Sequence, residues 1–460
     1  MEGNRKLVNI HRQDINNNNQ NNNNRNYEDQ MISTLAISPD TNNNCNNNNN
    51  NNNRKERNFM ELPNEVTLRI ISLLDPNDIG NICQTNRTLN MFCEENIVWK
   101  AVCKRKWAHS PIFKRRPINS WKDYYSKKLT LMSDKNGLCW IEIKPSGERP
   151  SPRYQNTSTV VGKYIYYIGG QEIPEKRFND IFRFDTESYT FERVIPRHGF
   201  PPNFARHSAV SIDHRIFTFG GFNGISKHFN LCIFDTKLES WEYIESRGET
   251  PIPRTNHSAT VIGKYMYIYG GMYKGNNNQL IFLDDLFCLD TETLIWRKIY
   301  AKGDIPPAKC GHKLMTFDNK LLLFGGGYGL EWEKKYNDVH IYDPLFNTWT
   351  KVNVKGNAPV CTFTIVFNAG PFMFVFGGQS LSDDSLTNDL YLLDTVNMEW
   401  SRIDAPSAPH PRDMGSGNMV GSTMFMFGGY NGSAIDELHA LKMEKRLELL
   451  LPSTRLSPIS

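Results

Sequence analysis

The sequence of 460 residues predicts a mostly-β protein, in which six repeated units follow a small all-α module and a disordered Asn-rich N-terminal arm. Three observations lead to this fold class. A Gly-Gly doublet recurs six times, almost all of the 26 Phe, 19 Tyr, 9 Trp and 32 Gly follow the arm, and 22 of the first 53 residues are Asn. Aromatic and glycine richness of this kind is typical of a large β domain. The expected parts are the arm (1–57), the helical module (58–106), a linker or extension of that module (107–138), the repeat domain (139–443) and a C-terminal tail (444–460).

The N-terminal arm contains Asn runs such as Asn16–Asn19, Asn21–Asn24 and Asn46–Asn53. A segment of this composition cannot bury enough apolar surface to offset the conformational entropy that ordering costs. We therefore expect disorder and exclude the arm from the fold.

Composition and charge exclude several classes of protein. No apolar run approaches the roughly 18 to 20 residues that a membrane-spanning helix needs, and the N-terminus lacks the apolar core of a signal peptide. The nine cysteines are scattered without any Cys-x-x-Cys pair, which predicts reduced thiols rather than disulfides or a zinc site. The net charge of +4 is too small to indicate a nucleic-acid partner. We expect a cytoplasmic or nuclear protein with no membrane partner.

The helical module begins with Pro63, which suits the first turn of a helix, and a break follows at Asp75-Pro76-Asn77-Asp78. Six of the nine residues from Val66 to Leu74 are apolar. A module this small cannot bury so many apolar groups internally. The surplus predicts a protein partner.

The same stretch resembles an F-box, through Leu62-Pro63, Glu65, Val66, Ile70, Leu74, Asp78-Ile79, Ile82-Cys83, Leu89 and Trp99. The resemblance implies that the module binds the Skp-type adaptor of cullin ubiquitin ligases. The residues expected on the adaptor surface are Leu62, Pro63, Val66, Ile70, Leu74 and Ile82. The alternative is a helical cap that only packs on the repeat domain. The segment Ser120–Tyr125 resembles the extension that many F-box modules carry, or is an aromatic patch that covers the join.

The six Gly-Gly doublets begin at Gly169, Gly220, Gly270, Gly325, Gly377 and Gly428, with spacings of 51, 50, 55, 52 and 51 residues. Each doublet ends an aromatic-aliphatic run, as in YIYYI and FMFVF, and a second run ending in Asp follows in five of the units, as in NDIFRFD. A polar turn and an aromatic residue come next, and one more strand precedes each doublet. Four short strands in a unit of about 50 residues predict one blade of a β-propeller.

The Gly-Gly doublet, the spaced aromatic residue and the Pro-Arg opening resemble Kelch repeats, which implies a six-bladed Kelch β-propeller over residues 139 to 443. The sixth unit has no aromatic residue after its third strand. The segment from Cys139 to Ile143 has the alternation of a fourth strand and lies before the first complete unit. We expect it to close the ring as the outer strand of the sixth blade, which removes open strand edges.

Signs of catalysis are missing from the sequence: we find no phosphate-binding loop, nucleophile elbow or metalloprotease motif. His207, His257 and His312 recur with the repeat period, which favours a structural hydrogen bond over a metal site. Glu333, Asp338 and His340 suggest an iron site of the kind some Kelch enzymes hold, but Asp338 occupies a repeated position and a turn-capping role is preferred. We expect no catalytic residue, no metal and no cofactor.

A series of basic residues precedes the first strands, at Arg153, Arg206, Arg254, Lys309 and Arg412. A ring of such groups at one mouth of the channel would bind carboxylates or phosphates, whereas the alternative is that each base braces a neighbouring blade. The loops that follow the doublets add Tyr273, Tyr328 and Trp332, residue types that anchor interfaces. These eight residues are the predicted target-binding residues.

Together the two resemblances imply a non-catalytic substrate receptor of an SCF-type cullin ubiquitin ligase. Its F-box would bind the Skp-type adaptor, and its propeller would bind an acidic or phosphorylated target protein. One alternative is a Kelch scaffold for a cytoskeletal or small-GTPase partner, without a ligase role. A second is a propeller enzyme, which tightly bound metal would indicate.

Overall fold

A computed structural model of the chain describes residues 59, 62–107, 120–131, 138–224, 231–275, 278–329, 333–359, 361–380 and 383–443. The Asn-rich arm, in which we expect disorder, and the C-terminal tail lie outside the described residues. The chain divides into two compact units, the first ending with residues 119–125 and the second running from Ser126 onward together with residues 110–118. Within the described residues no helix is long and apolar enough to cross a membrane.

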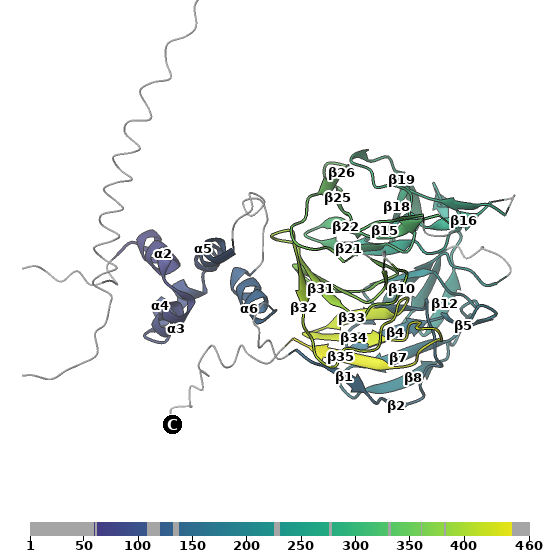
Figure 1. Ribbon diagram of the computed structural model, residues 1–460, viewed down its shortest axis with the longest axis horizontal. Coiled ribbons are helices and arrows are strands. Elements are labelled where there is room, and N and C mark those ends of the chain that lie inside the picture. Colours follow the sequence, from purple (N-terminus) through teal and green to yellow (C-terminus); the bar gives the residue numbers. More distant parts are fainter. Residues whose placement is uncertain are drawn as a thin grey trace, which may run out of the picture. The chain divides into compact units, whose positions relative to one another are not determined.

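The helical unit contains α2 (Asn64–Leu73), α3 (Pro76–Ile82), α4 (Arg87–Glu94), α5 (Asn96–Trp107) and the first half of α6 (Trp121–Leu131) (Figure 1). Local signals in the sequence set the helix ends. Pro76 occupies the first turn of α3, and the Asn86 side chain accepts a hydrogen bond from the Leu89 backbone N–H at 2.8 Å, which caps α4. Arg105 of α5 donates to the carbonyls of Ser72 and Leu74 at 2.8 and 2.6 Å. Its charge thus stabilises the C-terminal end of α2.

An aromatic cluster closes the helical unit and includes the start of α6. The Trp99 indole N–H donates to the Cys93 carbonyl at 2.7 Å, and the Trp99 and Tyr125 ring centroids lie 5.3 Å apart. Trp121 and Tyr124 are buried in the same unit. The segment Ser120–Tyr125 therefore packs as part of the helical unit.

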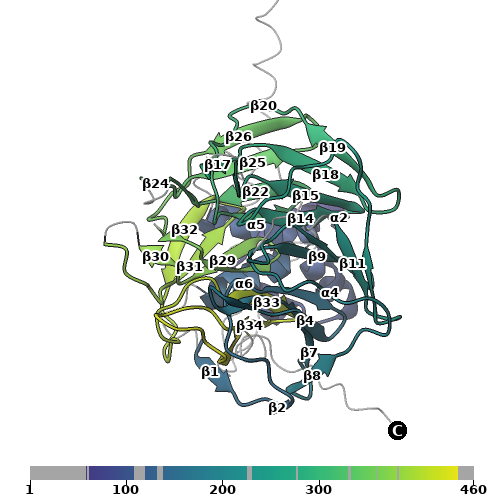
Figure 2. The same ribbon diagram turned by 90° about the vertical axis from the view of Figure 1, so that its right-hand side faces the viewer.

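The second unit is a six-bladed propeller of antiparallel four-stranded blades, which follow one another around a ring (Figure 2). The inner, first strands are β3 (Thr157–Val161), β9 (Ser208–Ile212), β14 (Ser258–Ile262), β21 (Lys313–Phe317), β28 (Ile365–Ala369) and β33 (Ser416–Val420). The second strands are β4 (Tyr164–Ile168), β10 (Arg215–Phe219), β15 (Tyr265–Tyr269), β22 (Lys320–Phe324), β29 (Phe372–Phe376) and β34 (Thr423–Phe427).

The third strands are β7 (Ile181–Asp185), β11 (Cys232–Asp235), β18 (Leu286–Asp290), β25 (Val339–Asp343), β31 (Leu390–Asp394) and β35 (Leu438–Lys442). The fourth strands are β8 (Thr190–Val194), β12 (Ser240–Tyr243), β19 (Ile295–Ile299), β26 (Thr348–Val352), β32 (Glu399–Ile403) and β1 (Trp140–Ile143). Short segments pair in parallel with three of these outer strands, namely β2 (Ser146–Gly147) with β8, β13 (Arg247–Gly248) with β19 and β20 (Lys302–Gly303) with β26. They cover edges that would otherwise expose unpaired backbone groups.

The ring closes through β1, as the sequence predicted. β1 pairs antiparallel with β35, with Trp140 opposite Leu441 and Ile143 opposite Leu438. The Trp140 ring lies 5.3 Å from Phe376 of the preceding blade. Trp400 contacts Phe324 at 4.9 Å in the same way, and Trp296 contacts Phe219 at 5.2 Å. The N-terminal strand thus supplies the aromatic residue that the sixth unit lacks.

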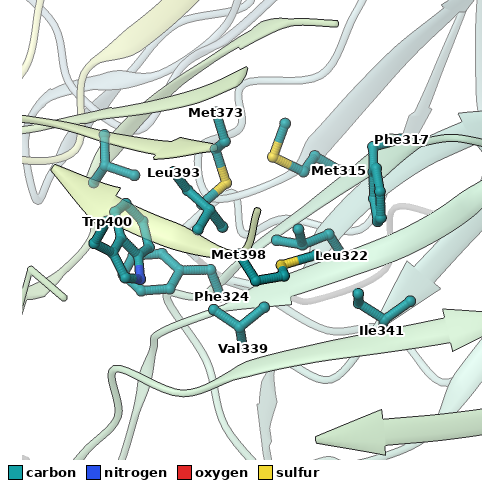
Figure 3. Packing of buried hydrophobic residues seen from close by; sticks show 11 residues of the cluster. Met315, Phe317, Leu322, Phe324, Val339, Ile341, Met373, Leu393, Met398 and Trp400 are labelled. Atoms are coloured by element: carbon teal, nitrogen blue, oxygen red, sulfur yellow. The ribbon is translucent and has the colours of Figure 1, made fainter. Parts of the chain in front are cut away.

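The hydrophobic core lies between neighbouring blades. Figure 3 shows the cluster between blades four and five, where Met315, Phe324 and Val339 meet Met373 and Trp400. All are buried, and similar clusters join blades six and one, one and two, two and three, and three and four. Burying large side chains such as these contributes roughly 1.5 to 3 kcal/mol each. The strand pattern that predicted the blades therefore also fixes how they associate.

The Gly-Gly doublets are required because the backbone of the next blade passes close to them. Gly220 has a φ of 70°, and a Cβ atom there would lie 2.5 Å from the Arg254 carbonyl oxygen. That carbonyl accepts a hydrogen bond from the Gly221 N–H at 2.9 Å. A side chain would break this link between blades two and three.

Eight additional strands form four two-stranded pairs at the end of the propeller where the doublets lie. Three pairs are hairpins that follow a doublet: β5 (Gln171–Ile173) with β6 (Lys176–Arg177), β16 (Met272–Lys274) with β17 (Leu280–Phe282) and β23 (Gly327–Tyr328) with β24 (Lys334–Lys335). The fourth pair joins β27 (Cys361–Thr362), which precedes the first strand of its blade, to β30 (Gln379–Ser380), which follows the doublet. We call this end of the propeller the loop face.

Candidate functional site

Apolar side chains on one stripe of α2 remain exposed in the helical unit. Val66 and Leu73 are 42% and 45% exposed, and residues seven positions apart lie on nearly the same side of an α-helix. Pro63, immediately before the helix, is exposed as well. Uncovered apolar groups on a unit of this size are typical of a protein-binding surface.

The six predicted adaptor residues differ in how far they are exposed. Pro63 and Val66 are exposed, and Leu62, Leu74 and Ile82 are half-buried. Ile70 is only 5% exposed, because its side of α2 packs against α4 and α5. The expectation that Ile70 contacts a partner is therefore corrected: it is a core residue of the helical unit.

Three exposed apolar residues of the unit did not figure in the sequence prediction. Besides Leu73, Met91 of α4 is 66% exposed and Ile97 of α5 is 61% exposed. Each has at least one apolar neighbour in the sequence, so the hydrophobic pattern does not distinguish it from the residues that the core buries.

Four of the five predicted basic residues on the loop face are buried and paired with an acidic residue. Arg153 donates to Asp180 at 2.5 and 3.0 Å and to the Gly169 carbonyl at 3.0 Å. Arg254 pairs with Asp285, Lys309 with Asp338 and Arg412 with Glu437. All four basic side chains are 0% exposed.

The expected ring of basic groups that face a ligand is corrected accordingly. Each acidic partner lies just before a third strand, so Arg153, Arg254, Lys309 and Arg412 tie the start of a blade to its own third strand. The alternative, that each base braces a neighbouring blade, is corrected as well, because these four side chains pair within their own blades. Asp338, expected to cap a turn, is the partner of Lys309 at 2.9 Å.

Arg206 makes different contacts from the other four basic residues, because it occupies a different position in its blade. Phe204 stands where Arg153 stands in the first blade, and Arg206 comes two residues later. Its φ is 65°, and its Nε–H donates to Gln155 Oε1 at 2.9 Å. Within the described residues no carboxylate pairs with Arg206, and burial together with the charge of Arg177 lowers the pKa of its guanidinium.

The position of Arg206 belongs to a closed ring of backbone hydrogen bonds. The N–H of each of six residues donates to the carbonyl of the residue in the preceding blade, over distances of 2.9 to 3.2 Å. All six have φ values between 53° and 66°. The members are Gln155, Arg206, Asn256, Gly311, Phe363 and Met414. The ring encircles the axis of the propeller, and Arg206 is its one charged member.

A second unpaired base, Arg177, accompanies Arg206 on the loop face. Its Nε atom is buried without a hydrogen-bond partner, and its guanidinium lies 4.8 Å from the Phe222 ring centroid. Burial lowers the pKa of Arg177. No repeated motif marks Arg177 in the sequence, because it lies in a hairpin outside the repeated pattern. Together Arg177, Arg206 and Phe222 form a basic and aromatic patch with the chemistry to bind a carboxylate or phosphate.

The predicted aromatic residues lie on the same face, in blades three and four. The Tyr328 ring is 4.7 Å from Phe282 of the β16–β17 hairpin, and Tyr273 pairs with Ile281 in that hairpin. Tyr328 is exposed and Tyr273 is half-buried. Trp332 lies outside the described residues.

The three repeated histidines join neighbouring blades. His207 Nε2 lies 2.9 Å from Thr157 Oγ1, His257 Nε2 lies 2.8 Å from Ser208 Oγ, and His312 Nε2 lies 3.0 Å from the Tyr269 carbonyl. Burial lowers the pKa of His207 and of His312 to about 3, so both rings are neutral. In the part of the chain that the structure describes, no three metal-binding side chains cluster.

Comparison with known proteins supports both units. The model of the KLHDC2/KLHL20/DRC7 Kelch-repeats domain matches residues 120–326 and 275–447, and the F-box-like model matches residues 59–105. Acyl-CoA-binding domain-containing protein 4 of Arabidopsis thaliana is 26% identical over 68% of this chain and 50% of its own length.

The chain covers a larger share of the length of two other relatives. Kelch domain-containing protein 3 of Bos taurus is 25% identical over 55% of this chain and 69% of its own length. The N-(sulfonatooxy)prop-2-enimidothioate sulfolyase of Thlaspi arvense is 25% identical over 64% of this chain and 90% of its own length. The chain spans about half the length of the two acyl-CoA-binding domain-containing relatives from Arabidopsis thaliana that it matches.

Proposed function

Because the chain belongs to the family of F-box proteins with KLHDC2/KLHL20/DRC7-type Kelch repeats, we propose that it is a substrate receptor of an SCF-type cullin ubiquitin ligase. The F-box binds the Skp-type adaptor, and the loop face of the propeller binds a target protein. The observation that carries the proposal is the exposed stripe of Pro63, Val66 and Leu73 on the F-box unit. We expect this role to be performed in the cytoplasm or the nucleus.

The contribution of the chain to ubiquitylation is positional. A receptor that holds a target beside the activated ubiquitin raises the effective concentration of the two reactants, without any covalent step on its own residues. On this proposal the chain is not an enzyme. The target binds at the patch of Arg177, Arg206 and Phe222, whose unpaired guanidinium groups favour an acidic or phosphorylated segment.

The adaptor surface is tested by the variant Val66→Asp with Leu73→Asp. Both side chains are exposed in the chain alone, so the charges are tolerated there, but at an interface they would be buried without partners at a cost of several kcal/mol. We expect affinity purification of this variant to lose the adaptor and cullin. Thr88→Asp, at an exposed polar position of α4, is the matched control and should keep both. Undiminished recovery from the double variant would contradict the proposed surface.

The alternative is a Kelch scaffold without a ligase role. It predicts that the chain captures a partner through the loop face but recovers no cullin, whether or not Val66 and Leu73 are changed. The same purification therefore separates the two functions.

A further inference from the structure

The first strands of the propeller enclose a cavity of about 600 Å³ that the proposed target site does not use. Residues from all six first strands line it, most of them carrying hydroxyl, amide or imidazole groups. Its volume is in the range of cavities that bind small molecules. Neither Arg177 nor Arg206 belongs to its lining.

One cation stands in this otherwise neutral cavity. The first residue of the first strand is a hydroxyl residue in four blades, namely Thr157, Ser208, Ser258 and Ser416. The fourth blade has Lys313 at that position. No aspartate, glutamate or arginine is among the residues that line the cavity. Lys313 is therefore the one group there whose charge is not compensated.

The ammonium group of Lys313 has no hydrogen-bond or ion-pair partner among the described residues, whereas the buried Lys309 contacts Asp338 at 2.9 Å. Burial lowers the pKa of Lys313 to about 8. Lys313 is half-buried, and a partly desolvated ammonium group without a counter-charge is costly. A bound anion would remove this cost.

The neighbouring blade offers a second donor. Ser258 Oγ accepts a hydrogen bond from the Leu314 N–H at 2.9 Å, which leaves its O–H available to a ligand. The imidazoles of His207 and His257 also border the cavity, and burial lowers the pKa of both well below the usual value. They are neutral near pH 7 and add no charge.

We propose that this cavity binds a small oxyanion, held by the ammonium group of Lys313 and the hydroxyl group of Ser258. Ammonium-to-oxyanion hydrogen bonds are charge-assisted, and the hydroxyl adds a directed contact. The site is independent of the target surface and of the ligase role. It makes the propeller responsive to a small ligand that carries a phosphate, sulfate or carboxylate group.

Isothermal titration calorimetry of the full chain with sulfate at pH 7 tests the site. We expect one binding site, and we expect Lys313→Met to weaken it by at least about tenfold. Lys302→Met, which removes an exposed lysine of β20, should bind as the unchanged chain does. Parallel titrations with phosphate and succinate separate a tetrahedral oxyanion from a carboxylate, and binding of either supports the site.

The dependence of sulfate affinity on pH is a second test of the site. Sulfate does not titrate between pH 7 and pH 9, and neither do the two neutral imidazoles at the cavity. Because burial lowers the pKa of Lys313 to about 8, affinity for sulfate should fall by about tenfold between pH 7 and pH 9. The Lys313→Met variant should show no such fall.

Stability without anion completes the test. The account predicts that Lys313→Met and Lys313→Gln fold and are at least as thermally stable as the unchanged chain in buffer free of oxyanions, since each removes an uncompensated charge. The proposal is overturned if none of the three anions binds, if Lys313→Met binds sulfate as tightly as the unchanged chain, or if both variants fail to fold.

Discussion

At the scale of single residues, a basic side chain on the loop face has one of two roles, and the presence of a carboxylate partner decides which. Arg254 is fully buried and paired with Asp285. Arg177 and Arg206 lie on the same face without such a partner among the described residues. The first kind of arginine contributes to stability, and the second is available to a ligand.

Replacing Arg177 and Arg206 together by Ala should abolish capture of the target. A charged hydrogen bond contributes roughly 1.5 to 3 kcal/mol to binding, so losing both should weaken affinity by at least about a hundredfold. Thermal stability should change little, because neither guanidinium has an acidic partner to leave behind. The check is affinity purification followed by quantification of the captured partner.

Two controls make this prediction specific. Arg297→Ala removes an exposed arginine from the outer strand β19 and should leave capture unchanged. Arg254→Ala should lower stability by about 3 to 5 kcal/mol, because it leaves Asp285 without its partner. Retained capture in the Arg177 and Arg206 double variant would place the target site elsewhere on the propeller.

Asp413 predicts a pH dependence of stability. Its carboxyl group is buried, its Oδ1 atom has no hydrogen-bond partner, and burial raises its pKa to about 7. The folded state therefore holds this proton up to about pH 7, whereas the unfolded chain releases it near the ordinary value of 3.8. The contribution of Asp413 to the free energy of unfolding falls as the pH rises from about 4 to 7 and stays constant above pH 7.

The variant Asp413→Asn removes this titration. We expect it to exceed the unchanged chain in the free energy of unfolding by more than about 1 kcal/mol at pH 8 and to differ little at pH 4. Urea denaturation at the two pH values measures this. Glu245→Gln, at an exposed position, is the control. An advantage that is equal at both pH values would contradict the assignment.

At the scale of secondary-structure elements, the second half of α6 completes the fifth blade. In two other blades the lysine of the turn before the second strand pairs with the last residue of the third strand, namely Lys163 with Asp185 at 2.9 Å and Lys264 with Asp290 at 3.1 Å. The fifth blade has Gly370-Pro371 at that turn. Its Asp394 pairs instead with Lys128 of α6 at 2.5 Å, and both side chains are buried.

Lys128→Ala should therefore destabilise the second unit by about 3 to 5 kcal/mol, because Asp394 would keep a buried charge without this partner. Lys163→Ala should leave stability nearly unchanged, since the Lys163 side chain is solvent-exposed. The double variant Lys128→Met with Asp394→Asn should regain part of the loss. Chemical denaturation measures all three, and equal effects of Lys128→Ala and Lys163→Ala would contradict the buried role.

At the scale of the whole molecule, the repeats made the fold predictable. The doublets at Gly169 and Gly428 mark the first and the last blade along the chain. The alternation of residue types around Trp140 belongs to no complete unit and identifies the strand that closes the ring. The site was less predictable. Whether Arg153 binds a ligand or Asp180 depends on a contact across 27 residues. The offset of Arg206 is visible in the sequence, because Arg206 lies 14 residues before the doublet at Gly220 and Arg153 lies 16 residues before the doublet at Gly169.

The F-box unit shows the same limit. The hydrophobic pattern does not distinguish Val66, which is exposed, from Ile70, which is buried, because a short apolar run does not say which side of α2 the other helices cover. Met91 and Ile97 are exposed on α4 and α5, where no periodicity points to them. Packing between helices, rather than the sequence of any one helix, decides the composition of a docking surface.

The central claim is that one chain joins a cullin ligase to a target through two separate surfaces. Affinity purification of the full chain, with and without proteasome inhibition, tests it most directly. We expect cullin to be recovered in both conditions and a ubiquitylated partner to accumulate when the proteasome is inhibited. The variant with Arg177→Ala and Arg206→Ala should lose this partner. The variant with Val66→Asp and Leu73→Asp should still capture the partner, but without ubiquitin. Recovery of a partner with no cullin in either condition would contradict the claim.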